Sequence, residues 1–247
     1  MALPDDDAPR FSARDLEREK LAALKQFAYG LSHEINNPLT NIATRAQMLL
    51  VDEKDTDRRK ALTTINAQAF RAFEMLADLM LFAHPPAPVK TTFDLLELLQ
   101  QLIAEHQLVA DQQKTSLELA LLPAEITAIT ADRTQLAAAI AALLKNALEA
   151  LKISGEIRLS VAASELATGQ AALEITVADN GPGITAEVRR HLFDPFFSGR
   201  EAGRGLGLGL SKAYRIAELH GGELRVQSQL GEGSRFSLVI PQPAATS

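Results

Sequence analysis

Apolar residues recur every three or four positions through the first third of the chain, the spacing of one face of an α-helix. A first apolar stripe contains Leu21, Leu24, Phe27, Leu31, Ile35, Ile42 and Leu49. The polar segment Val51–Arg58 interrupts it, and a second stripe follows with Leu62, Ile65, Ala69, Phe73, Leu76 and Met80. The pattern predicts a helical hairpin over residues 12–83, whose first helix of about 40 residues would be roughly 60 Å long.

Two long helices cannot bury so wide an apolar stripe against each other alone. The simplest solution is an α-helical hairpin that forms a dimeric four-helix bundle, so we expect a homodimer. The alternative is that the second half of the same chain covers the stripe.

The second half of the chain has a mixed pattern. Three prolines in residues 84–92 end the helix and predict a stiff linker. Helices are expected at Leu95–Ala110, Arg133–Leu151 and Leu210–Leu219, and strands at Ser116–Leu122, Ile126–Ala131, Glu156–Ala163, Ala172–Ala178, Glu223–Gln229 and Ser234–Ile240. Mostly hairpin-linked strands mixed with helices predict an α+β two-layer sandwich over residues 93–241. Residues 1–11 and 242–247 are then terminal tails.

Composition narrows the classes of function. The 247 residues carry 25 Lys+Arg against 31 Asp+Glu and no Cys, which excludes disulfides, Cys-ligated zinc and a thiol nucleophile. A net charge of −6 disfavours a nucleic-acid partner. The longest apolar run, Leu136–Leu144, is too short for a bilayer, which needs about 20 residues, and the acidic N-terminus is no signal peptide. We expect a soluble, cytoplasmic chain without membrane contact, although a longer parent protein could carry a membrane anchor.

Two glycine-rich segments suggest a phosphate-binding site. The segment Asp179–Gly183 follows a predicted strand, and Gly203–Gly209 opens a predicted helix. Glycines let backbone amides approach phosphate oxygens, and a helix N-terminus favours anions. The second segment is neither a P-loop, because no Gly-Lys-Ser/Thr ends it, nor a dinucleotide fingerprint, because Leu210 replaces the required Gly or Ala. Taken alone, it could also be a structural turn.

Two polar residues complete the candidate nucleotide site. Asn146 lies on a strongly apolar helix, where a carboxamide is costly without partners. A Mg²⁺ ion held between Asn146 and nucleotide phosphates would supply one partner, and a nearby backbone group is the alternative. Asp179 could accept a hydrogen bond from an exocyclic amine such as that of adenine, or it could cap a turn.

In this order, the segments resemble the N, G1 and G2 boxes of the ATPase superfamily that includes gyrase, Hsp90, the MutL repair proteins and histidine kinases. The resemblance implies ATP as the bound nucleotide, with Mg²⁺ at Asn146. The implied contact residues are Asn146, Asp179, Gly181, Gly183, Gly203, Gly205, Gly207 and Gly209. Residues 192–197 resemble the F box of histidine kinases, and Phe197–Gly203 would be a mobile lid over ATP.

One position separates the members of that superfamily. Gyrase-like and Hsp90-like ATPases place a water-activating Glu four residues before the metal Asn, where this chain has Ala142. Hydrolysis by water therefore lacks its base, which disfavours a gyrase-like ATPase. Histidine kinases often carry a second Asn there, so the chain departs from that pattern too.

The predicted hairpin offers a nucleophile. Ser32–Leu39 resembles the H box of two-component sensor histidine kinases. A neutral imidazole such as that of His33 can attack phosphorus near pH 7, and Glu34 can orient the ring and take its proton. Pro38 should kink or loosen the helix there. A zinc-protease motif would need His at position 37, which is Asn37.

The resemblance implies that His33 takes the γ-phosphoryl group of ATP and passes it to an aspartate in a response-regulator receiver domain. Asn37 matches the position that orients water when the regulator is dephosphorylated. The form of the N box around Asn146 resembles the nitrogen-regulatory subtype, with Glu149 where other subtypes have Lys. The alternative is a dimeric scaffold that binds ATP without kinase activity. The remaining histidines are predicted to be structural, with His220 at a helix C-terminus, where a positive charge is favourable.

Overall fold

The computed structural model describes the backbone of residues 13–120, 128–197 and 207–243, with side chains at residues 26 and 30 and from residue 34 onward within these ranges. The chain divides into two compact units, Met1–Pro85 and Pro86–Ser247. Each unit is described separately below.

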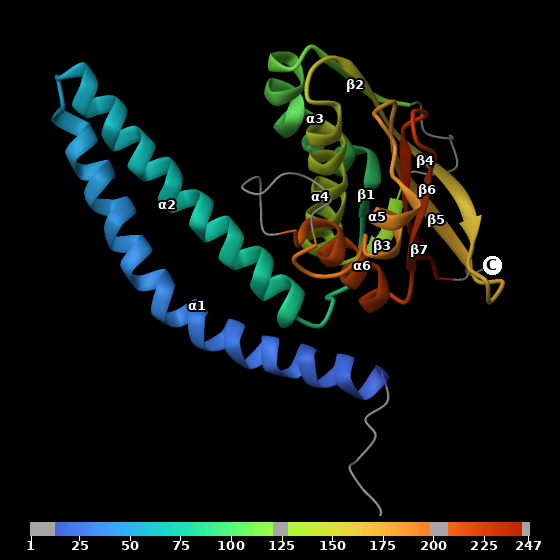
Figure 1. The fold of residues 1–247 in the computed structure, drawn as a ribbon. Helices are drawn as coiled ribbons and strands as arrows, with labels where there is room; N and C mark the ends of the chain where they lie inside the picture. The colour runs from blue at the N-terminus through green and yellow to red at the C-terminus, as the bar shows by residue number, and fades with distance from the viewer. Residues whose placement is uncertain (1–12, 121–127, 198–206, 244–247) are drawn as a thin grey trace, which may run out of the picture. The chain divides into compact units, whose positions relative to one another are not determined.

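The first unit is a pair of antiparallel helices, α1 (Ala13–Asp52) and α2 (Thr56–Ala83) (Figure 1). The predicted 40-residue length of the first helix is confirmed. Helix α2 starts at the N-cap residue Asp55, whose carboxylate accepts the backbone N–H groups of Asp57 and Arg58 at 3.0 and 2.9 Å. Such capping stabilises the start of a helix because its first N–H groups have no partner within the helix.

The hairpin buries only part of its apolar surface. Small residues lie between the helices, with Ala43, Ala46 and Ala69 buried. Larger apolar side chains remain open: Ile35, Ile42, Leu49 and Ile65 are 37%, 46%, 62% and 46% exposed. The first three lie seven residues apart, so they line one face of α1.

The second unit is an α+β sandwich, as predicted. Its five-stranded sheet has the order β2-β4-β5-β7-β6, formed by β2 (Thr115–Leu119), β4 (Gly155–Glu165), β5 (Ala171–Asp179), β7 (Ser234–Pro241) and β6 (Glu223–Ser228). Helices α3 (Leu95–Gln112), α4 (Arg133–Leu151) and α6 (Gly209–Leu219) pack against the sheet (Figure 1). The core consists of aliphatic side chains from both layers, including the fully buried Leu143, Leu159, Ile175 and Leu238.

Two short elements of the second unit were not predicted from the sequence. Strand β1 (Thr91–Asp94) pairs with β3 (Ala128–Ala131), and α5 (Ala186–Arg190) is one short turn of helix. Neither β1 nor α5 was predicted, because segments this short carry no readable periodicity. Strand β2 pairs with β4 in parallel, whereas the other pairs of the large sheet are antiparallel.

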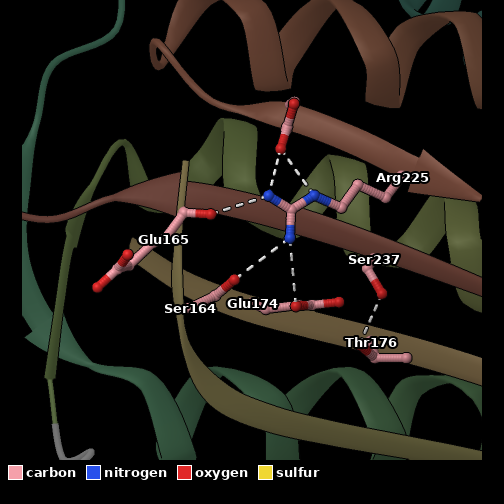
Figure 2. Close-up of polar contacts among 7 residues, drawn as sticks. Ser164, Glu165, Glu174, Thr176, Arg225 and Ser237 are labelled. Atoms are coloured by element: carbon pink, nitrogen blue, oxygen red, sulfur yellow. Dashed lines mark hydrogen bonds and ion pairs between the residues drawn. The ribbon is translucent and has the colours of Figure 1, made fainter. Parts of the chain in front are cut away.

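The sheet face away from the helices carries a polar network that spans several strands (Figure 2). The Arg225 guanidinium on β6 donates to the Glu165 carbonyl oxygen at 2.9 Å and to Ser164 Oγ at 3.3 Å, and it forms ion pairs with Glu174 and Glu223. These contacts tie the edge strand to the end of the β4–β5 hairpin. Beside them, the buried hydroxyl groups of Thr176 and Ser237 pair at 2.8 Å.

Among the described residues, no helix is long and apolar enough to cross a membrane.

Candidate functional site

The loop after β5 begins with a nearly buried carboxylate. Asp179 is the last residue of β5 and is 7% exposed. Its Oδ1 accepts the backbone N–H of Gly181 at 2.9 Å, which fixes the first turn of the loop. The alternative in which Asp179 caps a turn is therefore confirmed for its Oδ1 atom. A carboxylate can accept several hydrogen bonds, so this contact is compatible with the predicted hydrogen bond from an exocyclic amine.

Gly183 lies where a side chain would not fit. Its φ is +71°, and a Cβ there would lie 2.0 Å from the backbone oxygen of Gln229. The neighbouring backbone is held by two hydrogen bonds: Gly231 N–H donates to the Pro182 oxygen at 2.8 Å, and Ile184 N–H donates to Ser228 Oγ at 2.9 Å. The loop after Asp179 therefore lies directly against the turn between β6 and β7.

Helix α4 lies against one glycine of each glycine-rich segment, Gly181 and Gly209. Near its C-terminal end, a Cβ on Gly181 would lie 3.6 Å from the Ala150 Cβ. On another turn of α4, a Cβ on Gly209 would lie 3.9 Å from the Ala142 Cβ. Asn146 is half-buried between these two positions in the sequence of α4. The fold thus brings Asn146, the loop after Asp179 and the start of α6 into one neighbourhood.

The start of α6 has no side-chain cap. Its N-cap residue, Leu208, supplies no side-chain hydrogen bond to the first turn. Every other helix with a described N-cap is capped by an Asp or Thr side chain. Uncapped N–H groups at a helix N-terminus are suited to phosphate oxygens. This observation supports the predicted role of the second glycine segment.

Two residues of the predicted F box contact α6 or the residue range just before it. Phe193 lies against α6, and the Phe197 backbone lies against Gly207. The Phe193 ring stacks on Tyr214 of α6, with ring centroids 5.1 Å apart. Gly207 has φ +66°, and a Cβ there would lie 2.6 Å from the Phe197 backbone oxygen. Burial, followed by the nearby Glu218, raises the pKa of Tyr214. Sequence reasoning missed Tyr214, because an aromatic residue on a helix face gives no sign of its partner.

The predicted residues Gly203 and Gly205, and all of the predicted lid after Phe197, lie outside the described residues.

The predicted phosphoacceptor segment lies within α1. His33 belongs to the backbone of this helix, and its side chain is outside the described set. Glu34 and Asn37 are exposed, so both are accessible to a partner. Helix α1 continues through Pro38, and its ribbon is bent (Figure 1). A kink caused by Pro38 itself stays a prediction.

His220 is structural and lies at the C-terminus of α6, as predicted, but the expected positive charge is wrong. The side chain is 1% exposed, its Nε2 accepts the backbone N–H of Asp132 at 3.0 Å, and its Nδ1 lies 2.9 Å from the Ile216 oxygen. With Nε2 as acceptor, the proton is on Nδ1 and the ring is neutral. Burial lowers the pKa of His220 and outweighs the hydrogen bond with the Ile216 backbone, which acts to raise it.

The described residues contain no group of three or more His, Cys, Asp or Glu side chains that could hold a metal ion. Asn146 offers a single amide oxygen. This is compatible with Mg²⁺, which commonly takes few protein ligands and completes its shell with substrate phosphates and water.

A helical hairpin followed by an α+β nucleotide domain is also what comparison with known proteins finds. The sequence profile of the His Kinase A (phospho-acceptor) domain matches residues 23–88. That of the histidine kinase-, DNA gyrase B- and HSP90-like ATPases matches residues 131–244. These two domains, in this order, are the domains of a sensor histidine kinase catalytic core.

Individual relatives belong to the same class. The chain is 31% identical to the signal transduction histidine-protein kinase AtoS of Escherichia coli over 92% of its length, and 31% identical to sporulation kinase C of Bacillus subtilis over 91%. It spans 36% and 50% of those two proteins. Full-length ShkA, solved in complex with AMPPNP, matches 90% of this chain and 47% of its own at 25% identity, with a TM-score of 0.75.

Proposed function

We propose that the chain is an ATP-dependent protein histidine kinase that phosphorylates itself on His33 and passes the phosphoryl group to an aspartate of a response-regulator receiver domain. The observation that carries this proposal is the shared neighbourhood of Asn146, the Asp179 loop and the uncapped start of α6. The hairpin with His33 supplies the acceptor. The AMPPNP complex of the related ShkA supports ATP as the nucleotide.

In the proposed reaction, a neutral ring nitrogen of His33 attacks the γ-phosphorus of ATP. A bond from nitrogen to phosphorus forms, the bond from the γ-phosphorus to the bridging oxygen breaks, and ADP leaves. Glu34, the next residue along α1, orients the ring and takes its proton. Most of the rate comes from positioning and charge stabilisation, because phosphoryl transfer needs little covalent chemistry from the protein.

The nucleotide contacts are assigned to the same elements. The Asp179 carboxylate accepts a hydrogen bond from the adenine amine. The glycines from Gly181 to Gly209 let the backbone approach the nucleotide, and the N-terminus of α6 faces the phosphates. Mg²⁺, bound through the Asn146 oxygen and the phosphates, would neutralise the charge of the triphosphate.

The proposal assigns residues 12–83 to dimerisation and phosphotransfer, 84–92 to the linker and 93–241 to ATP binding. The exposed apolar face of α1 with Ile35, Ile42 and Leu49 supports a homodimeric four-helix bundle. We further propose that Asn37 orients water when the response regulator is dephosphorylated. We assign the chain to a nitrogen-regulatory-like subtype of sensor kinase. We also propose that the kinase core acts in the cytoplasm.

The deciding experiment incubates the 247-residue chain with Mg²⁺ and γ-labelled ATP. We expect label that is labile in acid and stable in base, that is lost in His33→Ala and that is kept in the control His106→Ala, on α3. Label that survives in His33→Ala would overturn the assignment of His33.

The same experiment separates the alternatives. Free phosphate without labelled protein would favour a gyrase-like ATPase. Nucleotide binding with neither label nor phosphate release would favour the dimeric scaffold without kinase activity, the second candidate, which Ala142 supports because the chain lacks the usual side chain at that position.

A further inference from the structure

The segment that joins the two units is fastened to the second unit almost at once. Helix α2 ends at Ala83, and the backbone N–H of His84 still bonds the Met80 oxygen at 2.7 Å. Two residues later, the Pro86 oxygen accepts a hydrogen bond from Gln135 Nε2 at 2.8 Å. Pro85 alone separates the helix cap from this first contact.

Three contacts, which we call the linker clasp, hold residues 86–90 on the second unit. They are Gln135 Nε2 to the Pro86 oxygen at 2.8 Å, Val89 N–H to Asp132 Oδ2 at 2.9 Å, and Lys90 Nζ to the His220 oxygen at 3.1 Å. A linker that is rich in proline loses little further entropy when it is fixed, so a few hydrogen bonds suffice to hold it.

Asp132 is the central residue of the clasp. Its Oδ1 caps α4 by accepting the Gln135 N–H at 2.9 Å, while its Oδ2 takes the linker N–H of Val89. Its own N–H bonds His220. Burial alone would raise the pKa of Asp132, but the backbone donors of Gln135 and Val89 outweigh it and lower the pKa. The carboxylate therefore remains charged and able to accept these bonds at neutral pH.

The clasp lies at the far ends of the two helices that carry candidate nucleotide residues. Asn146 is 13 residues along α4 from its first residue, Arg133, which corresponds to about 20 Å. Gly209 begins α6, and His220 caps its C-terminus. Two rigid helices thus connect the linker to the nucleotide site.

We propose that Asp132 and Gln135 are positioning residues that, together with the contact of Lys90 with the His220 backbone oxygen, fasten the linker to the catalytic unit and confine the hinge between the units to residues 84–85. This inference rests on the proposed function, because hinge length matters only if the nucleotide must reach His33. A longer free tether lowers the effective concentration of one site at the other, as about the −3/2 power of its length. The clasp thereby keeps the nucleotide within reach of the acceptor.

The test compares two cap substitutions in the 247-residue chain. Asp132→Ser combined with Gln135→Leu keeps a capping oxygen on α4 but removes two linker contacts. The matched control, Asp94→Ser, makes the same cap change on α3, where Asp94 accepts the Glu97 N–H at 3.1 Å. Lys90→Met removes the third contact from the exposed linker side and leaves the buried residues unchanged.

Three quantities are measured: hydrogen exchange of the Val89 amide, affinity for AMPPNP and the rate of His33 labelling at saturating ATP. In the double variant we expect exchange at least about tenfold faster, a labelling rate about three- to tenfold lower and an unchanged affinity. Lys90→Met should show smaller changes in the same direction, and Asp94→Ser should show none.

Two results would overturn the inference: an unchanged Val89 exchange rate, or faster exchange with an unchanged labelling rate. If the unsubstituted chain is never labelled, the proposed function fails instead, and the exchange data still decide whether the clasp exists.

Discussion

Gly183→Ala tests how tightly the loop after Asp179 is held. A Cβ at this position would lie 2.0 Å from the Gln229 oxygen, and both atoms belong to paired backbone segments that resist movement. Gly169 has nearly the same backbone angle, φ +78° against +71°, but no atom lies within 4 Å of a Cβ there. Gly169→Ala is therefore a control that carries the conformational cost without the collision.

The two costs can be separated. An L-residue in the left-handed region costs about 1–2 kcal/mol, and this applies to both variants. Overpacking against fixed backbone adds about 1–3 kcal/mol, and only at Gly183. We expect Gly169→Ala to destabilise the second unit by about 1–2 kcal/mol and Gly183→Ala by about 2–5 kcal/mol.

Urea unfolding monitored by circular dichroism measures both losses, and calorimetric titration with AMPPNP measures the effect on the site. Because Asp179 and Gly183 share one loop, Gly183→Ala should also weaken nucleotide binding, whereas Gly169→Ala should not. Equal destabilisation by the two variants would refute the close approach of this loop to the β6–β7 turn.

Three further predictions concern single groups. Burial lowers the pKa of His220 from 6.5 and Lys90 lowers it further, while the hydrogen bond with the Ile216 backbone and the charge of Asp132 oppose this lowering. Its neutral form therefore contributes stability above about pH 6.5 that is lost as the pH falls below this value, and thermal unfolding of His220→Gln should show a flatter pH profile. Asn146→Ala should weaken binding of Mg²⁺ with AMPPNP about ten- to a hundredfold by titration calorimetry, while binding without the metal changes less. Thr176→Val should cost about 1–3 kcal/mol in urea unfolding, because it leaves the Ser237 hydroxyl unpaired, and adding Ser237→Ala should restore most of the loss.

The sequence alone was sufficient for the elements with strong local signals. The apolar helix was predicted at Arg133–Leu151 and lies there, because its periodicity is regular and Asp132 is a good cap. The order of Asn146 and the two glycine segments likewise predicted the class of nucleotide domain. These features depend on neighbours a few residues away, which the sequence displays directly.

The tertiary structure decided the features that depend on distant partners. His220 carries its proton on one ring nitrogen because Asp132, 88 positions away, donates to the other. Gly183 must be glycine because the Gln229 backbone lies against it. Burial, charge state and close approach depend on which segments the fold brings together, and local sequence does not encode that choice residue by residue. The sequence determined the elements and their chemistry. Packing between distant elements determined the protonation of His220, the hydrogen bonds that hold the linker and the conformation of the loop after Asp179.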